Sequence, residues 1–511
     1  MINPAAPISI TAPHDAAELT SPEPPVLEYA TPTPPSLRSR TVRTSLWTLV
    51  GFGASQIVRF GSNLVLTRLL VPHDFGLAAL VGIFVNMLQL FSDVGIGPAI
   101  VQSPRGDEEA FLNTAWTLSV VRGIILWLAS CVIAWPVSLY YHEPLLLPLI
   151  VVTGFNSVLS GFYSTTLLQL NRHMQAGKIT LLNLASQILT TGVMVAIAYH
   201  RHSVWAIIFG GLTSNLFTLI VSHFLIEGFR NRFAWDRSAA RELFHFGGWI
   251  FVSTAVTFFA NDVDRLIFGS ISSITVLGLY QQATTLVRMP IDLIGRLAAV
   301  SLFPALSRSA ELGREEVRRK LLRARGVILP LGIAAVIGLG LGAPLFVYVL
   351  YDNKFQDAGW MARYMSVGLW ITILQLSSDR TLLALGHSRS LAVANGVNMA
   401  ATISFAFAGL ALGQHLHHAM PGFILGVALG NLAGHLVIQS ELARHGVGIY
   451  WQDLRYTLLL ASIAAAGLLL PKLIGPWFHG HQAQTVKFAI GALVVAGTCL
   501  WAGLRAWKWM R

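Results

Sequence analysis

Long apolar stretches follow one another along most of the chain and leave little choice of fold. Roughly fourteen of them lie between residues 45 and 506, each long enough for an α-helix to cross a bilayer, which takes about 20 residues. Charged residues make up only 12% of the 511 residues, whereas an ordinary soluble domain carries about 25%. The sequence therefore predicts an all-α polytopic membrane protein with about 14 transmembrane helices. The predicted spans are 45–68, 75–101, 111–139, 144–169, 179–199, 204–226, 243–268, 275–303, 326–350, 359–385, 389–412, 420–441, 456–475 and 486–506.

The basic residues of the connecting segments predict the orientation of the chain. With the N-terminus in the cytoplasm, the inner loops and the two ends of the chain hold about 23 of the 35 Lys and Arg residues. Cytoplasmic segments carry such an excess, so both termini are expected to be cytoplasmic. The longest inner connection, about residues 305–325, is expected to be a basic anchor, with a surface amphipathic helix as the alternative. Residues 1–40 are rich in proline and predict a disordered cytoplasmic tail.

A weak internal repeat divides the spans into two sets of six. Thr67–Leu70 at the end of the first span resembles Asp264–Ile267 at the end of the seventh, and Thr166–Leu170 resembles Thr381–Leu385. Extended further, the second match aligns an asparagine of the fifth span with Asn398. Because six is even, both copies enter the membrane in the same direction, which is a parallel repeat. The expected organisation is a six-helix lobe over 41–227, a cytoplasmic linker over 228–242, a second lobe over 243–443, and two additional helices with a short basic tail over 444–511.

The eighth predicted span carries three charged residues at a regular spacing. Arg288, Asp292 and Arg296 recur every four residues and so lie within an arc of roughly 80° on one helix face. A charge at mid-bilayer costs about 2.5–3.5 kcal/mol even on the gentler insertion scales. This face is therefore expected to meet protein or a water-filled cavity, which makes it a candidate transport path.

Further cationic and polar residues lie in the first and third spans. Arg59 and Asn63 are one turn apart on one helix face, and Arg122 lies about a third of the way into the third span. With Arg288 and Arg296, these arginines would place guanidinium groups in both lobes, where they suit a phosphate or diphosphate. The alternative is that each arginine pairs internally, for instance Arg288 with Asp292, and holds helices together.

Carboxylates within the spans are candidates for ion coupling or for purely structural roles. Asp93 lies in a Gly- and Pro-containing segment that could break the helix, where it would satisfy freed backbone groups. Asp264 has the neighbouring Arg265 as a potential partner. The full set of candidates is Asp93, Asp262, Asp264, Asp292 and Asp379.

No residue pattern points to a cofactor. The histidines are scattered, mostly in outer loops, and predict no metal site. His435 lies within a span and is expected to be a structural histidine with its hydrogen bonds satisfied, with a proton relay as the alternative. Gly177 and Lys178 lack the other residues of a phosphate-binding loop, so ATP hydrolysis is not expected. We also expect no nucleic-acid partner.

Several short motifs give the chain a family resemblance over roughly residues 40–510. They are Leu66–Gly76, Asp93–Gln102, Leu168–Arg172, Asn261–Ile267 and Phe303–Arg308. In their order and spacing they resemble the Wzx-type oligosaccharide flippases, the polysaccharide-transporter family of the multidrug/oligosaccharidyl-lipid/polysaccharide exporter superfamily. That resemblance implies two six-helix lobes around a V-shaped cavity that move by alternating access. It also implies an oligosaccharide on a polyprenyl diphosphate as substrate, carried across the bacterial cytoplasmic membrane.

These observations lead to one hypothesis and several rivals. The protein is expected to flip a lipid-linked oligosaccharide repeat unit for exopolysaccharide, capsule or O-antigen synthesis, without being an enzyme. Its expected partners are that lipid, membrane lipids, and a polysaccharide polymerase with export machinery. The rivals are an ion-coupled multidrug exporter, a flippase for a lipid-linked peptidoglycan precursor, and an enzyme acting on lipid-linked sugars. The outer loops are short for an external catalytic domain, which disfavours the last. The substrate-binding candidates are Arg59, Arg122, Arg288, Arg296 and Asn63.

Overall fold

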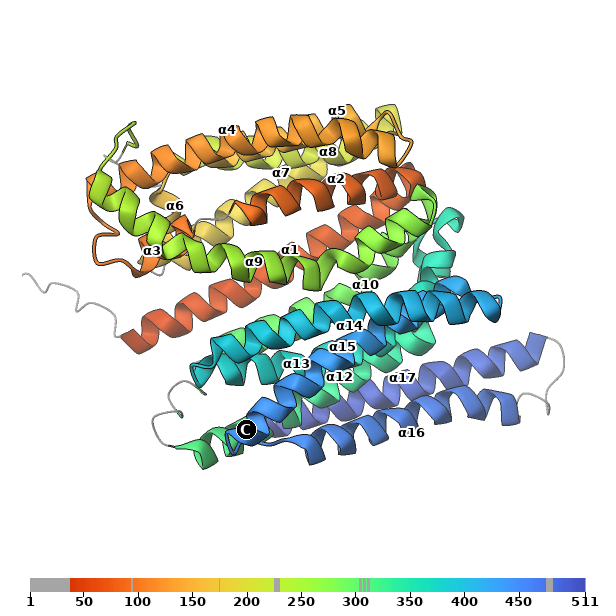
Figure 1. The fold of residues 1–511 in the computed structure, drawn as a ribbon. Helices are drawn as coiled ribbons and strands as arrows, with labels where there is room; N and C mark the ends of the chain where they lie inside the picture. Colours follow the sequence, from red (N-terminus) through yellow and green to blue (C-terminus); the bar gives the residue numbers. More distant parts are fainter. Residues whose placement is uncertain are drawn as a thin grey trace, which may run out of the picture. The chain divides into compact units, whose positions relative to one another are not determined.

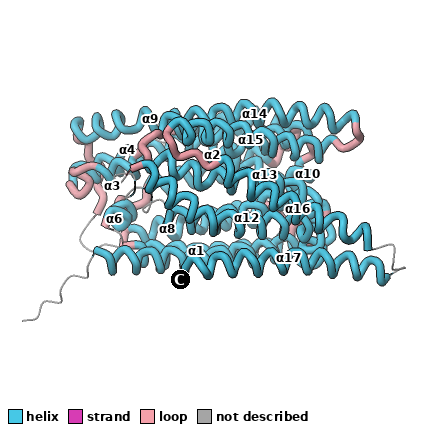
Figure 2. Tube along the Cα trace, turned by 90° about the horizontal axis from the view of Figure 1, so that it is seen from below, coloured by secondary structure: helices cyan, strands magenta, loops and turns pink. Residues whose placement is uncertain are grey.

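The computed structural model describes residues 37–92, 95–173, 175–224, 230–302, 306, 309, 313–474 and 481–510. These residues form helices and connecting segments, with no strand among them (Figures 1 and 2). The helices up to residue 222 are α1 (Leu37–Leu69), α2 (Pro72–Phe91), α3 (Ile96–Gln102), α4 (Glu109–Tyr140), α5 (Leu146–Gly161), α6 (Thr166–Arg172), α7 (Ala176–Arg201) and α8 (Trp205–Ser222). The later helices are α9 (Arg237–Ile271), α10 (Ile274–Leu297), α12 (Arg314–Leu350), α13 (Asp357–Ala384), α14 (Ser388–His415), α15 (Ala419–Arg444), α16 (Tyr450–Ile474) and α17 (His481–Met510). A short π-helical segment, Ala298–Leu302, continues α10, and a 3₁₀ turn, Asn353–Phe355, precedes α13.

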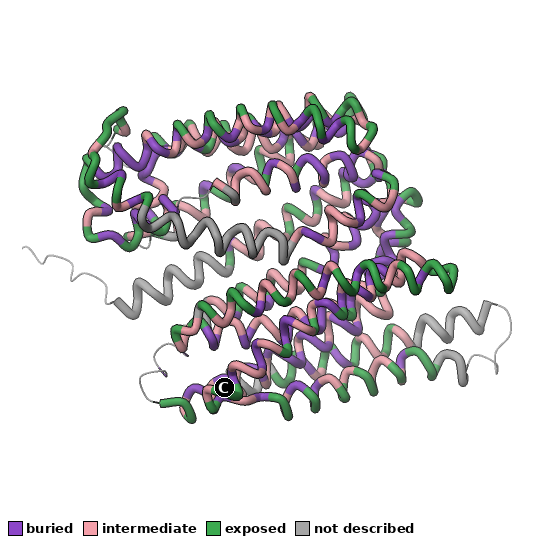
Figure 3. Tube along the Cα trace, viewed as in Figure 1, coloured by how far each residue is buried: buried purple, intermediate pink, exposed green. Residues whose placement is uncertain are grey.

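Each of the fourteen predicted spans coincides with one long helix or with a broken pair of helices. Taken singly, eight of the described helices have the length and apolar composition of a membrane span, and the pair α5 and α6 makes a ninth. Helix α10, with its three charges, is not one of the eight. Large apolar side chains such as Val132 and Trp135 on α4 are 77% and 64% exposed, and exposed positions recur along the helices (Figure 3). A soluble domain would bury them, so the chain is an all-α multi-pass membrane protein.

Two spans predicted as continuous are broken. The second divides into α2 and α3, and Gly95 before α3 has a φ of 64°, which glycine adopts at little cost. The glycines and proline of this segment had indicated such a break. The fourth divides into α5 and α6, bent by 64°. There, side chains accept hydrogen bonds from the freed backbone N–H groups: Ser222 from Ser164 at 3.1 Å and Asn231 from Thr165 at 3.2 Å.

Helix α9 contacts two sets of helices. Near its start, Ala239 and Leu243 pack in a buried cluster with residues of α3 and α4. Near its end, Phe268 stacks on Tyr280 of α10 and contacts Phe423 of α15. The helix begins at Arg237 rather than at residue 243, so part of the predicted linker is helical.

The start of α9 is fixed by a polar cluster around Asp236. The Asp236 carboxylate accepts a hydrogen bond from the backbone N–H of Ser238, and Arg105 donates to it at 3.1 Å. Bonds from the Ser238 backbone and hydroxyl, followed by the bond from Arg105, hold the pKa of the Asp236 carboxyl below its usual range. A second link lies nearby, where Ser103 donates a hydrogen bond of 2.6 Å to Glu242. The connection between α3 and α4 therefore holds the first turns of α9 in place.

Candidate functional site

Helices α2 and α10 cross in direct backbone contact. A Cβ atom on Gly76 would lie 1.9 Å from the carbonyl oxygen of Ile274, and one on Gly278 would lie 1.8 Å from that of Pro72. Both distances are far below van der Waals contact, so only glycine fits at these two positions in this arrangement. The start of α2 is itself well fixed, since Asp74 accepts hydrogen bonds from the backbone N–H groups of Val71 and Val204, both at 3.2 Å.

Asn63 joins three segments that lie far apart in the sequence. Its side-chain amide donates a hydrogen bond to Gln282 of α10 at 3.0 Å, and the Tyr351 hydroxyl donates to its carbonyl oxygen at 2.9 Å. Gln282 is almost fully buried, and Tyr351 is only 5% exposed. The structure thus places Asn63 in a closed contact between α1, α10 and the end of α12.

Arg122 holds the end of α2. Its Nε donates to the hydroxyl of Ser92 at 2.9 Å, and its Nη2 donates to the carbonyl oxygen of Gln89 at 2.7 Å. The last carbonyl groups of a helix have no partner within that helix, so a guanidinium at this position stabilises the point where α2 stops. Arg122 therefore corresponds to the structural alternative, in which an arginine bonds to other protein groups and holds helices together.

Arg59 and Arg296 have different surroundings. Both residues are exposed, Arg59 on α1 and Arg296 on α10. Neither side chain makes a hydrogen bond or ion pair with any residue that the structure describes. Because both lie within predicted spans, their guanidinium groups are available for an anionic ligand in the membrane region.

Arg288 belongs to a cluster of charges between α9 and α10. Arg265 donates to Asp262 at 3.0 Å, and Arg288 lies 3.9 Å from the same carboxylate. The side chains of Asp262 and Arg265 are 14% and 12% exposed, whereas that of Arg288 is 47% exposed. The partner suggested for Asp264 was wrong: its carboxylate accepts a hydrogen bond from Tyr280 at 2.7 Å, while Arg265 turns to Asp262 one turn earlier.

A polar cavity of about 270 Å³ adjoins this cluster, and we call it the polar cavity. Residues of α9, α10, α13, α14 and α15 line it, and Asp264, Arg288 and Asp292 contribute the charges. Two further lining residues, Asn398 and Thr402, each have a side-chain oxygen that is buried without a hydrogen-bond partner in the described residues. Buried oxygens without a partner are costly, and the cavity that both residues line offers space for a polar group that could satisfy them.

The sequence identified only part of the polar cavity. Asp264, Arg288 and Asp292 were candidates, whereas Thr402, Gln375 and Asn431 were not. Asn398 had appeared in the internal repeat, as an asparagine aligned with another asparagine. That alignment was the one feature of the sequence that could have identified it as a site residue.

Two carboxylate candidates in the described residues, Asp262 and Asp379, do not line the polar cavity. Asp379 lies further along α13, and one of its carboxylate oxygens is buried without a partner among the described residues. Asp93 lies outside the described residues. No three His, Cys, Asp or Glu side chains in the described ranges come together as a metal site.

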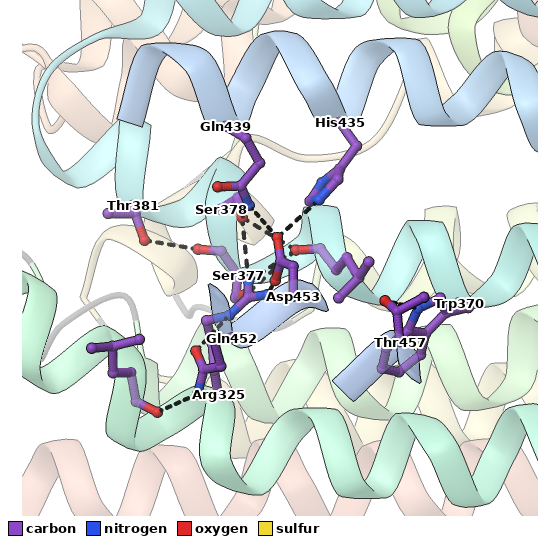
Figure 4. A network of polar contacts seen from close by, with 12 residues as sticks. Arg325, Trp370, Ser377, Ser378, Thr381, His435, Gln439, Gln452, Asp453 and Thr457 are labelled. Atoms are coloured by element: carbon purple, nitrogen blue, oxygen red, sulfur yellow. Dashed lines mark hydrogen bonds and ion pairs between the residues drawn. The ribbon is translucent and has the colours of Figure 1, made fainter. Parts of the chain in front are cut away.

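A second buried polar group lies between α12, α13, α15 and α16 (Figure 4). Arg325 is fully buried and forms an ion pair with Asp453, which also accepts hydrogen bonds from His435 at 3.0 Å and from Gln439 at 2.6 Å. Arg325 further donates to the hydroxyl of Ser377. We call these five residues the Arg325 network.

The sequence had placed Arg325 at the end of a basic loop, yet α12 already begins at Arg314. His435 was expected to be a structural histidine with its hydrogen bonds satisfied. This agrees with the structure at Nε2, which bonds to Asp453, while Nδ1 has no partner among the described residues.

The helical arrangement is shared with solved structures of a lipid II flippase and of multidrug transporters. The chain is similar to a lipid II flippase, MurJ, with a TM-score of 0.66 and 14% identity over 87% of this chain and 97% of that one. It is also similar to an inward-facing multidrug MATE transporter, with a TM-score of 0.58 and 15% identity over 78% of this chain and 94% of that one. At these identities the likeness shows the fold alone.

The family follows from the sequence. Residues 65–359, more than half of the chain, match the family described as polysaccharide biosynthesis protein, and the chain belongs to that family. It is 25% identical over 260 residues to the amylovoran biosynthesis protein AmsL of Erwinia amylovora, a match that covers 50% of this chain and 66% of that protein. It is 21% identical over 329 residues to the lipopolysaccharide biosynthesis protein WzxC of Escherichia coli K12, covering 63% and 65%. The chain thus spans slightly less than two thirds of the length of these relatives.

Proposed function

We propose that the protein translocates a polyprenyl-diphosphate-linked oligosaccharide repeat unit across the bacterial inner membrane, for the synthesis of a surface polysaccharide. The family supports this assignment, and so do the names of the relatives, which refer to amylovoran, lipopolysaccharide and teichuronic acid biosynthesis. The fold supports it too, since it is shared with a lipid II flippase.

The observation that carries the proposal is the exposure of arginines within membrane-spanning helices. Arg59 on α1 and Arg288 and Arg296 on α10 are all exposed. Guanidinium groups bind phosphate through two parallel hydrogen bonds and stay charged inside proteins. We assign these three arginines to the diphosphate and to acidic sugars of the cargo. We place Arg122 outside this set because it holds the end of α2.

Alternating access requires a contact that closes one side of the path and opens later. We assign that role to the crossing of α2 and α10 with the Asn63 contact, on the outer side of a protein whose termini are cytoplasmic. Opening it would separate two six-helix lobes, residues 41–227 and 243–443, around a V-shaped cavity. Helix α9, which packs on both sets of helices, would bend as the lobes move.

Transport against a gradient needs a source of energy. A cation bound in the polar cavity would couple transport to a gradient of that ion. We propose that a coupling cation binds there, held by the oxygens of Asn398 and Thr402 together with Asp264 or Asp292. Asp262 would instead neutralise Arg265 and Arg288. We keep Asp379, which does not line the polar cavity, and Asp93, which lies outside the described residues, as further coupling candidates.

The test is export of the surface polymer in a strain that lacks the gene. We expect the variant with Arg59, Arg288 and Arg296 all changed to alanine to abolish export while its amount in the membrane stays normal. The matching triple lysine variant keeps the charge and should retain part of the export. Normal export by the alanine variant would refute the assignment.

The same strain distinguishes the other candidates. Sensitivity to cationic drugs on deletion would favour a multidrug exporter, and lethality would favour a flippase for peptidoglycan precursors. We propose a transporter rather than an enzyme because the connections assigned to the outer side are short, such as residues 141–145 and 202–204. A polymerase and export machinery would be its partners.

A further inference from the structure

A second cavity, of about 760 Å³, lies between α12, α13, α15 and α16, and we call it the lateral groove. Its walls are largely apolar, with Ile337 and Leu341 from α12 and Leu460 and Ala464 from α16 among them. Val367, Leu429 and Leu468, which also line it, are 46%, 50% and 53% exposed. In a membrane protein, a groove with exposed apolar residues at its edge opens toward lipid.

Helix α13 separates the lateral groove from the polar cavity. Met365, Leu369 and Thr372 of α13 line the polar cavity, whereas Val367, Trp370 and Leu374 line the lateral groove. Within each set the residues are spaced by three or four positions, so the two sets occupy opposite faces of one helix. A molecule with its polar head in the polar cavity cannot place its tail in the lateral groove without passing through α13.

The base of the lateral groove is closed by hydrogen bonds. Trp370 donates to the hydroxyl of Thr457 on α16 at 3.0 Å (Figure 4). Leu374, a groove residue one turn further along α13, accepts a hydrogen bond of 3.1 Å from Arg325 at its carbonyl oxygen, which links the groove to the Arg325 network. Because Asp453 of that network belongs to the first turn of α16, the ion pair holds α16 in place as one wall.

One cation lies at the lateral groove. Arg363 is exposed, and its side chain makes no hydrogen bond or ion pair with the residues that the structure describes. It is six residues from the start of α13, or about 9 Å along the helix. A long arginine side chain at that depth extends toward the head-group region, where phosphate is its natural partner.

We propose that the lateral groove binds a resident anionic glycerophospholipid, with an acyl chain along the apolar walls and the head-group phosphate on Arg363. The volume falls within the 300–1,000 Å³ typical of ligand sites, and the charge at the mouth is complementary to the phosphate. Helix α16, which lies outside the internal repeat, acquires a function as the wall of this lipid site. The inference does not depend on the transported substrate.

Native mass spectrometry of the full-length protein in mild detergent tests this proposal, with phosphatidylglycerol as the probe. We expect the wild type to retain one phosphatidylglycerol and to bind phosphatidylcholine at least about tenfold more weakly. Arg363→Ala should lose phosphatidylglycerol affinity by about tenfold or more, and Arg363→Lys by less. Arg389→Ala removes an exposed arginine that lines neither the polar cavity nor the lateral groove, and should change nothing.

A second variant alters the opposite part of the site. Ala464→Phe fills the lateral groove while leaving Arg363 intact, and it should also abolish retention of the phospholipid. Either variant tests the site if the other fails to fold. Equal retention of phosphatidylcholine, or unchanged retention in the folded variants, would overturn the proposal. Tighter binding of polyprenyl diphosphate than of phosphatidylglycerol would also overturn it, because the groove would then serve the cargo. Competition by inorganic phosphate alone would show that the apolar walls contribute nothing, which contradicts it as well.

Discussion

The hydroxyl of Tyr351 donates a hydrogen bond of 2.9 Å to the side chain of Asn63, 288 residues earlier in the chain. The bond links the end of α12 to α1, and the same asparagine continues to Gln282 of α10. Three segments therefore depend on one amide group, in a contact that transport by alternating access would have to break.

Removing that hydroxyl should loosen the closed contact. A typical intramolecular hydrogen bond contributes about 0.5–1.5 kcal/mol, so Tyr351→Phe should shift the equilibrium toward the open form by about two- to tenfold. Tyr199→Phe, which alters an exposed tyrosine on α7, is the control. An Ala283→Cys reporter leaves Asn63 and Gln282 in place, and its accessibility to a membrane-impermeant reagent reports the change, because Ala283 is fully buried next to Gln282. Equal labelling with and without the Tyr351 hydroxyl would exclude this contact as a gate.

A side chain at the crossing of α2 and α10 should force these helices apart. Gly278→Ala would place a methyl group 1.8 Å from the carbonyl oxygen of Pro72, and overpacking of this kind typically costs about 1–3 kcal/mol. We expect a lower thermal stability in detergent and greater labelling of the closed contact. Gly82→Ala, on α2 but with open space around its Cβ, should leave both quantities unchanged. A Gly278→Ala protein as stable as the wild type would show that the crossing is not tight.

Arg122 and Arg59 should behave differently when each is changed to alanine. Arg122→Ala removes two hydrogen bonds at the end of α2, and bonds from charged groups contribute about 1.5–3 kcal/mol each before allowance for solvent. The thermal stability of the Arg122 variant should therefore fall, whereas that of Arg59→Ala should stay close to the wild-type value. Differential scanning fluorimetry measures both. Similar stabilities would contradict the anchoring role of Arg122.

The Arg325 network should tolerate an apolar replacement better than a broken pair. Asp453→Ala leaves the fully buried Arg325 without its counter-charge, which typically costs about 3–5 kcal/mol. The double variant Arg325→Met with Asp453→Leu removes both charges and should recover much of the stability. Arg444→Ala, which removes an exposed arginine paired with Glu441, should have little effect. A double variant as unstable as Asp453→Ala would show that the charges themselves are required.

The helices could be predicted from the sequence because apolar length alone decides what spans a bilayer. The interruption before Gly95 was also visible, since glycine and proline mark it locally. The bend between α5 and α6 was not visible, because the groups that satisfy its backbone, Ser222 and Asn231, lie about 60 residues away.

The site was harder to predict for the same reason. An arginine within an apolar span is easily recognised in the sequence. Whether its side chain is exposed or paired depends on residues that lie far away in the chain. Arg122 donates hydrogen bonds to Ser92 and Gln89, some 30 residues earlier. Arg325 forms an ion pair with Asp453, 128 residues later. Arg59 and Arg296 remain exposed, and a single sequence cannot distinguish such exposed arginines from paired ones like Arg122 and Arg325.

The central claim is that exposed arginines in the membrane region bind an anionic lipid cargo, and direct binding of polyprenyl diphosphate to the purified protein tests it. The variant with Arg59, Arg288 and Arg296 changed to alanine should bind at least about tenfold more weakly than the wild type, and the triple lysine variant should be intermediate. Equal affinity of the folded alanine variant and the wild type would contradict the account.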